Sequence, residues 1–302
     1  MVTTPLGQPL NQVRSSGSFW RQLVAMSKKE LTIRSRYPIA VISDLLEMIF
    51  IVFFFVFAAK AFIPTGEEEF LRGTQILSGT SLFLGFLIYF FIQSGLYVIG
   101  QSLRSEQITG TLESLYLSPG SSLANMLSRV VYTILILIVF TPLVYVLTIL
   151  FIGDIQIQVG NLPLWLYFFS TLLGIVGVSF ALAGFALKIK EAMQPLLGLI
   201  EFSLLIFSGV FLPLDILGPG VFISILMPPS YGIDLLRSSL SGTTEPVISK
   251  FVGEILGIPT ASILPFQILF VGVSGLIFPF LGLAIFNRMI RSAQKKGSLA
   301  EF

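Results

Sequence analysis

The chain has 302 residues, of which 54% are hydrophobic and 11% charged, whereas charged residues make up about 25% of an ordinary soluble domain. This composition is typical of a membrane protein. The formal net charge of +2 is too small for a nucleic-acid surface and excludes DNA and RNA as partners. Because the sequence contains neither Cys nor His, it excludes disulfides, zinc sites built on these residues, cysteine nucleophiles and imidazole-based triads.

Residues 1–17 are predicted to form a flexible tail, and the segment that follows them predicts a helix. Trp20, Leu23, Val24 and Leu31 share one side of this helix, and its basic residues lie largely away from that side. This pattern fits an amphipathic helix on the inner membrane surface. The alternative is a positively charged leader that only fixes the topology.

Six apolar stretches follow, each long enough to cross a hydrocarbon core of about 30 Å as a helix. In lipid, a helix pairs its backbone polar groups within the segment, and the alternation of a barrel strand is missing from these stretches. The expected fold is therefore an all-α membrane protein in one transmembrane domain, residues 18–291, with a cytoplasmic tail at 292–302. The predicted spans are residues 39–63, 76–100, 130–152, 164–187, 195–212 and 263–286.

The distribution of Lys and Arg predicts the orientation of these spans. If the N-terminus is inside, fourteen basic residues lie on the cytoplasmic side and four on the outside. Cytoplasmic loops carry an excess of Lys and Arg, so both termini are expected in the cytoplasm. The expected location is the cell membrane.

Two connections between the spans are longer than simple turns. On the cytoplasmic side, Thr111–Leu117 can form a short helix that Pro119 and Gly120 end. Exposed carboxylates at Glu106 and Glu113 make this segment either a docking element for a soluble partner or an ordinary solvated loop. The external link, residues 213–262, contains two apolar segments too short to cross, which predicts re-entrant or interfacial helices between spans five and six.

Three acidic residues fall inside predicted spans: Asp44 and Glu47 in the first, and Glu201 in the fifth. Acidic groups in the membrane are costly and are often functional. They could be structural locks that pair with Arg34, Arg36 or the cytoplasmic link, or they could act on a substrate or a proton. An intramembrane enzyme or an ion-coupled carrier built on these carboxylates is a weaker alternative, because the spans lack polar clusters at mid-depth.

Two segments resemble the permeases of ABC-2 type transporters, the membrane subunits of one class of ATP-driven exporters. The first is Glu106-x-x-x-Gly110-Thr111-x-Glu113-x-Leu115-x-x-Ser118-Pro119. The second is Phe207-Ser-Gly209-Val-Phe-Leu-Pro213, followed by Met227-Pro-Pro229-Ser-Tyr231-Gly-Ile-Asp234-Leu-Leu-Arg237. The resemblance spans roughly residues 18–291.

This resemblance implies a coupling helix that sits in a cleft of a nucleotide-binding ATPase subunit. The residues that would make this contact are Glu106, Gly110, Thr111, Glu113 and Leu115. The chain contains no G-x-x-x-x-G-K-[ST] run, so it lacks a phosphate-binding Walker A loop. ATP and Mg would therefore bind to the partner subunit, and this chain would be a transport subunit without its own catalytic, cofactor or metal site.

The resemblance also implies that a second permease copy, identical or related, completes a pathway between spans two and five. The residues expected to line it are Phe86, Phe90, Gln93, Phe202 and Ile206. A phenylalanine-rich pathway favours a hydrophobic or amphipathic substrate, drug-like or lipid, over a polysaccharide or lipid-linked glycan. Glycines in the spans, at 79, 85, 95, 100, 174, 177 and 184, are expected to allow close helix packing.

Overall fold

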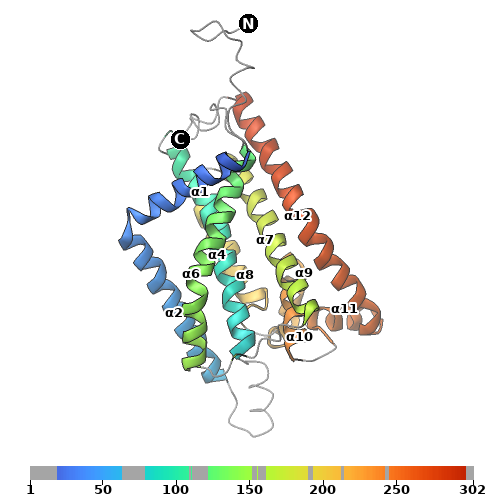
Figure 1. Ribbon diagram of the computed structural model, residues 1–302. Helices are drawn as coiled ribbons and strands as arrows, with labels where there is room; N and C mark the ends of the chain where they lie inside the picture. The colour runs from blue at the N-terminus through green and yellow to red at the C-terminus, as the bar shows by residue number, and fades with distance from the viewer. Residues whose placement is uncertain are drawn as a thin grey trace, which may run out of the picture.

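The computed structural model describes residues 19–62, 79–108, 110, 122–151, 155, 161–189, 193–211, 214–241 and 245–296. All regular elements within these residues are helices (Figure 1). They are α1 (Phe19–Ser35), α2 (Pro38–Phe62), α4 (Gly79–Ile108), α6 (Ser122–Phe151), α7 (Leu162–Ile189), α8 (Met193–Phe207), η3 (Leu214–Gly220), α9 (Val221–Ile225), α10 (Pro228–Ser241), α11 (Val247–Leu256) and α12 (Thr260–Lys296).

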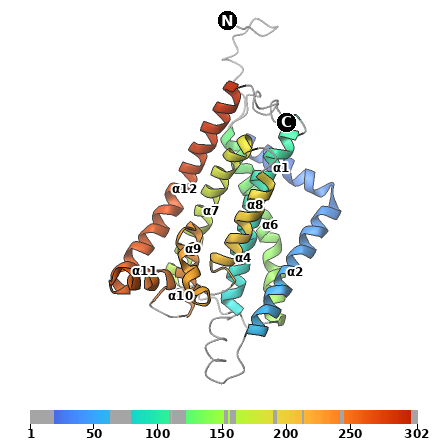
Figure 2. The same ribbon diagram turned by 180° about the vertical axis from the view of Figure 1, so that it is seen from behind.

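The long helices run side by side and alternate in direction along the chain. Helix α1 lies crosswise at the end of the bundle where α12 finishes, and α9, α10 and α11 gather at the opposite end (Figures 1 and 2). Helix α4 lies in the interior, and residues 79–92 of this helix are all buried. In contrast, α2, α6 and α12 expose many large apolar side chains, as expected for helices that face lipid.

Four helices, α4, α6, α7 and α12, are long and apolar enough to cross a membrane. They cover the second, third, fourth and sixth predicted spans, and their character agrees with an integral membrane protein. Helix α2 covers the first predicted span and has 25 residues, but its sequence includes Asp44, Glu47 and Lys60. The six-span count stays a prediction.

The fifth predicted span, residues 195–212, is not one continuous helix. Helix α8 has 15 residues and ends at Phe207, so at about 1.5 Å per residue it is shorter than a hydrocarbon core of about 30 Å. The chain then bends through Ser208, Gly209 and Val210, and Gly209 has a φ of 79°. A left-handed φ is easily adopted by glycine and ends the helix although the sequence stays apolar.

The predicted external link contains the helices η3, α9, α10 and α11. The two apolar segments singled out in the sequence fall in α9 and α10, so their helical nature is confirmed. These helices form a small apolar cluster around Leu214, Val221 and Ile248. Their depth in a membrane stays a prediction.

Glycines permit close contacts between α7 and α12. A Cβ added to Gly177 on α7 would collide with the backbone of Phe278 on α12, and one added to Gly184 would lie 3.0 Å from the Cα of Phe286. From the other side, a Cβ on Gly275 would lie 2.8 Å from the Cα of Ser170. The packing role predicted for Gly177 and Gly184 is confirmed, whereas Gly174 has no atom within 4 Å of an added Cβ.

Two neighbouring glycines therefore give a matched test of this packing. Gly177→Ala should destabilise the protein by about 1–3 kcal/mol, because the methyl group overpacks a backbone contact. Gly174→Ala should be neutral or stabilise the protein by up to about 1 kcal/mol, because alanine is the better helix former. Thermal unfolding of both variants in detergent measures the difference, and equal melting temperatures would contradict the packing role.

Candidate functional site

The predicted coupling segment begins at the end of α4, at the same end of the bundle as α1. Glu106 belongs to the last turn of this helix. Gly110 follows the helix, is exposed and has a φ of 69°. The other predicted coupling residues, Thr111, Glu113 and Leu115, lie outside the described residues. The role of all five stays a prediction.

The left-handed backbone of Gly110 explains why glycine occupies this place in the first motif. A residue with a Cβ costs about 1–2 kcal/mol in this conformation, and proline, with φ fixed near −65°, cannot adopt it. A Cβ added at Gly110 would meet no atom within 4 Å. The requirement is therefore for the backbone angle rather than for space.

Two of the three acidic residues predicted in the spans have hydrogen-bond partners on α4. The Gln93 amide donates to the Glu47 carboxylate of α2 at 2.9 Å, and the Tyr89 hydroxyl donates to the Glu201 carboxylate of α8 at 3.2 Å. Tyr89 and Gln93 lie one helical turn apart, so one face of α4 supplies both donors. Asp44 lies in α2. Both roles suggested for these acidic residues, structural and functional, stay predictions.

The residues predicted to line the pathway have very different surroundings within one chain. Phe86 is fully buried and packs against Phe90 and against Phe211, with ring centroids 6.5 Å and 5.1 Å away. Gln93 and Ile206 are partly buried, whereas Phe202 on α8 is 63% exposed. Their contact with a substrate stays a prediction.

Asp234, in the second motif, is the centre of a buried polar network at the far end of the bundle. Its carboxylate accepts hydrogen bonds from the backbone N–H groups of Val247 at 3.0 Å and Ile248 at 2.9 Å. It thereby caps the N-terminus of α11, whose own N-cap residue, Pro246, offers no side-chain bond. Gln267 of α12 donates to the same carboxylate at 3.0 Å.

Burial sets the electrostatics of this network. Asp234 is 4% exposed, and removal from water raises the pKa of its carboxyl to about 6, against the opposing effect of hydrogen bonds from Ile248, Gln267 and Val247. Gln267 also donates to the backbone carbonyl of Tyr231 at 3.1 Å. The network therefore joins α10, α11 and α12.

Arg237, at the end of the second motif, connects this network to α8. Its guanidinium donates to the carbonyl oxygen of Val210 at 2.8 Å, in the bend after α8. Burial lowers the pKa of Arg237 to about 10, so it stays charged at neutral pH. On the other side of the bend, the absence of a side chain at Gly85 lets α4 approach the Val210 carbonyl. The two halves of the second motif are thus in direct contact.

Sequence reasoning recorded Asp234 and Arg237 as motif residues but assigned them no role. Asp234 precedes the helix that it caps by 13 residues, so the spacing of an ordinary capping residue could not reveal it. The sequence feature that could have indicated a role is the spacing of Asp234 and Arg237, an acidic and a basic residue one helical turn apart in an apolar segment.

Comparison with known proteins identifies one family. The profile of the ABC-2 type transporter family matches residues 21–241, which include both motifs. Neither the curated proteins nor the solved structures give a match.

The buried carboxyl of Asp234 predicts a pH-dependent stability. Its pKa is about 6 in the folded protein against 3.8 for an exposed Asp, so the neutral form stabilises the fold below about pH 4 and this contribution is lost as the pH rises to about 6. The loss is about 3 kcal/mol at most. Asp234→Asn, which is neutral throughout, should remove this part of the pH dependence.

Thermal unfolding in detergent between pH 4 and pH 7 measures this effect. Glu254→Gln is the matched control, because Glu254 is an exposed acidic residue on α11 and its loss should leave the wild-type profile. Parallel profiles for the wild type and Asp234→Asn would contradict the assignment.

Proposed function

The chain belongs to the ABC-2 type transporter family, and on that basis we propose that it is the permease subunit of an ATP-driven exporter. Members of this family are transmembrane permease components whose ATPase activity generally resides in a separate subunit. The observation that carries the proposal is the family match over residues 21–241, which includes the predicted coupling segment and the second motif. The proposed partner is an ABC ATPase that binds ATP and Mg.

In the proposed orientation, the end of the bundle with α1 faces the cytoplasm of the cell. Exposed basic residues at this end support the orientation, because they include Lys28 and Lys29 on α1 and Arg288 and Arg291 on α12. The coupling segment would then emerge from α4 toward the ATPase. The helices η3 to α11 would close the outer end of the pathway.

The proposed transport path lies between two permease copies, identical or related, with α8 facing it. The exposure of Phe202, next to the equally exposed Leu199, supports this arrangement, because it leaves an apolar surface on α8. Such a surface suits a hydrophobic or amphipathic compound, drug-like or lipid. A polysaccharide or lipid-linked glycan is the second choice of substrate, because a glycan path favours exposed polar groups.

The proposal predicts that this chain stimulates its ATPase through the segment after α4. In reconstituted membranes, ATP hydrolysis by the ATPase should rise when the permease is present. Gly110→Pro should abolish the stimulation while the protein still inserts, because proline cannot adopt the φ of Gly110. Glu113→Arg should also abolish it by reversing a charge in the proposed contact.

Gly110→Asn is the control for this test, because asparagine tolerates a left-handed backbone better than other residues with a side chain. It should retain most of the stimulation. Equal activity of the Gly110→Pro and Gly110→Asn complexes would contradict the coupling role, and failure to associate with any ABC ATPase would contradict the proposed function.

Glu201 distinguishes the exporter from an ion-coupled carrier. In an exporter, Glu201→Gln should keep most of the transport, because the amide oxygen still accepts the hydrogen bond from Tyr89. A proton carrier needs a group that ionises, so the same variant would lose transport. Uptake of a fluorescent amphipathic probe into inverted vesicles, with ATP or with a proton gradient, measures both cases.

A further inference from the structure

Around its axis, helix α1 has a buried face, then an exposed apolar stripe, then an exposed basic face. Leu23 and Ser27 are buried. Next to them, at about 100° per residue, lie Trp20 and Val24, which are 69% and 65% exposed, together with the exposed Leu31. The exposed Arg21 and Lys28 follow on the far side of this apolar stripe. An exposed apolar stripe bordered by cations is the pattern of a helix that lies in a lipid headgroup layer.

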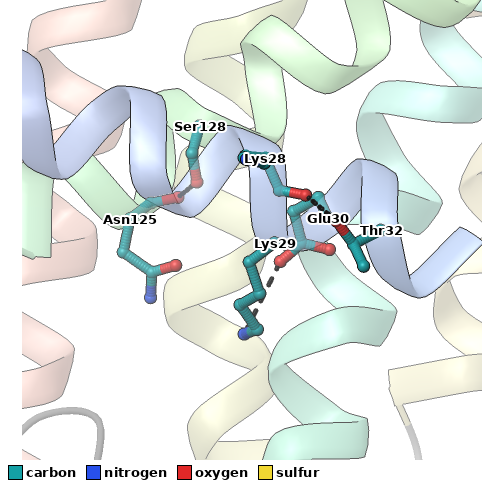
Figure 3. Close-up of polar contacts among 6 residues, drawn as sticks. All are labelled: Lys28, Lys29, Glu30, Thr32, Asn125 and Ser128. Carbon is teal, nitrogen blue, oxygen red and sulfur yellow. Dashed lines mark hydrogen bonds and ion pairs between the residues drawn. The ribbon is translucent and has the colours of Figure 1, made fainter.

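The charge of α1 is strongly positive and is not neutralised within the helix. Its sequence contains Arg21, Lys28, Lys29 and Arg34 but one acidic residue, Glu30. Glu30 is already paired with Lys29, whose Nζ lies 3.8 Å from the carboxylate (Figure 3). The exposed Arg21 and Lys28 therefore give this part of α1 an excess of positive charge.

Helix α6, which α1 crosses, adds no negative charge, because Ser122–Phe151 contains no acidic residue. Helix α2, which also contacts α1, carries Asp44 and Glu47, and the Glu47 carboxylate accepts a hydrogen bond from Gln93 of α4. Helix α6 presents polar donors instead: Asn125, Ser128, Arg129 and Thr133 are all buried. Within the described residues, the Nδ2 of Asn125 and the Oγ of Ser27 make no hydrogen bond. The Ser128 hydroxyl donates to the backbone carbonyl of Asn125 at 2.7 Å, so these groups belong to the interior of the bundle.

We propose that the exposed face of α1 forms a binding surface for anionic phospholipids. The apolar stripe would enter the acyl boundary, and the cations beside it would contact the phosphate and other acidic headgroup oxygens. A zwitterionic lipid accommodates the apolar stripe in its acyl chains, but its headgroup does not neutralise the excess positive charge. This inference goes beyond the proposed transport function and does not depend on it.

The surroundings of α1 favour lipid over a protein partner. The chain continues from α1 into α2, where Ile39, Ile42 and Leu46 are exposed. The apolar surface of α1 is therefore followed by the exposed apolar side chains of a long helix, as expected where both face the same bilayer.

Fluorescence of Trp20 tests the proposal directly. The chain has two tryptophans, so Trp165→Phe leaves Trp20 as the single reporter. The full-length variant is reconstituted into phosphatidylcholine vesicles that contain the same mole fraction of brominated phosphatidylcholine or brominated phosphatidylglycerol. Stronger quenching by the anionic lipid is expected. Arg21→Gln and Lys28→Gln should each weaken this preference about fivefold, as expected for a cation near an anionic surface.

Matched variants distinguish the effect of the α1 cations from that of other positive charges at the same end of the bundle. Arg288→Gln and Arg291→Gln remove exposed cations from α12 at the same end of the bundle, and they should leave the preference unchanged. Equal quenching by the two lipids would overturn the proposal. So would a preference that survives in the Arg21→Gln, Lys28→Gln double variant.

Two further outcomes have a defined meaning. If neither lipid quenches Trp20 and its emission shifts when the ATPase is added, α1 is a protein-docking surface and the proposal is wrong. If Trp165→Phe does not fold, the wild-type chain is purified from mixed vesicles and its retained lipid is measured. Retained phosphatidylglycerol in excess of its share of the mixture supports the proposal, and retention in proportion overturns it.

Discussion

Apolar helices gain little from the hydrophobic effect when they associate in a bilayer, because lipid tails are as apolar as leucine. Association therefore depends on how closely the backbones approach, and in this protein α7 and α12 approach through Gly177, Gly184 and Gly275. Helix α7 also contacts α4 and α10, and Gly232 allows α10 to pack against Thr171. Helix α7 thus links α12 to the buried α4 and to α10 at the far end of the bundle.

Hydrogen bonding imposes the second constraint on the fold. The bend after α8 leaves backbone carbonyls outside a helix, and the guanidinium of Arg237 binds the one on Val210. Asp234 likewise provides acceptors for the first N–H groups of α11. An unpaired backbone group costs several kcal/mol in a medium without water, so these two charged side chains allow irregular backbone at this end of the bundle.

Hydropathy predicted the long helices because their apolar length is a local property of the sequence. Hydropathy predicted that the fifth span ends at residue 212, whereas helix α8 ends at Phe207. Composition does not reveal the left-handed backbone at Gly209 or the hydrogen bond from Arg237 to the Val210 carbonyl. It also could not separate Phe86, which is fully buried, from Phe202, which is exposed: both are phenylalanines in apolar helices, and their surroundings depend on tertiary packing. The prediction of the coupling motif depended on its resemblance to a known family rather than on composition. Of its five predicted residues, the structure describes the backbone of Glu106 and Gly110.

The polar network around Asp234 has a consequence for biosynthesis. Its acceptor is translated first, the N–H groups of Val247 and Ile248 come 13 and 14 residues later, and Gln267 comes 33 residues later. The ribosome must therefore release most of the chain before this buried carboxylate has its full set of partners. The polar network at the far end of the bundle is therefore completed only after the first turns of α12 have been synthesised, so its assembly is a late step in translation.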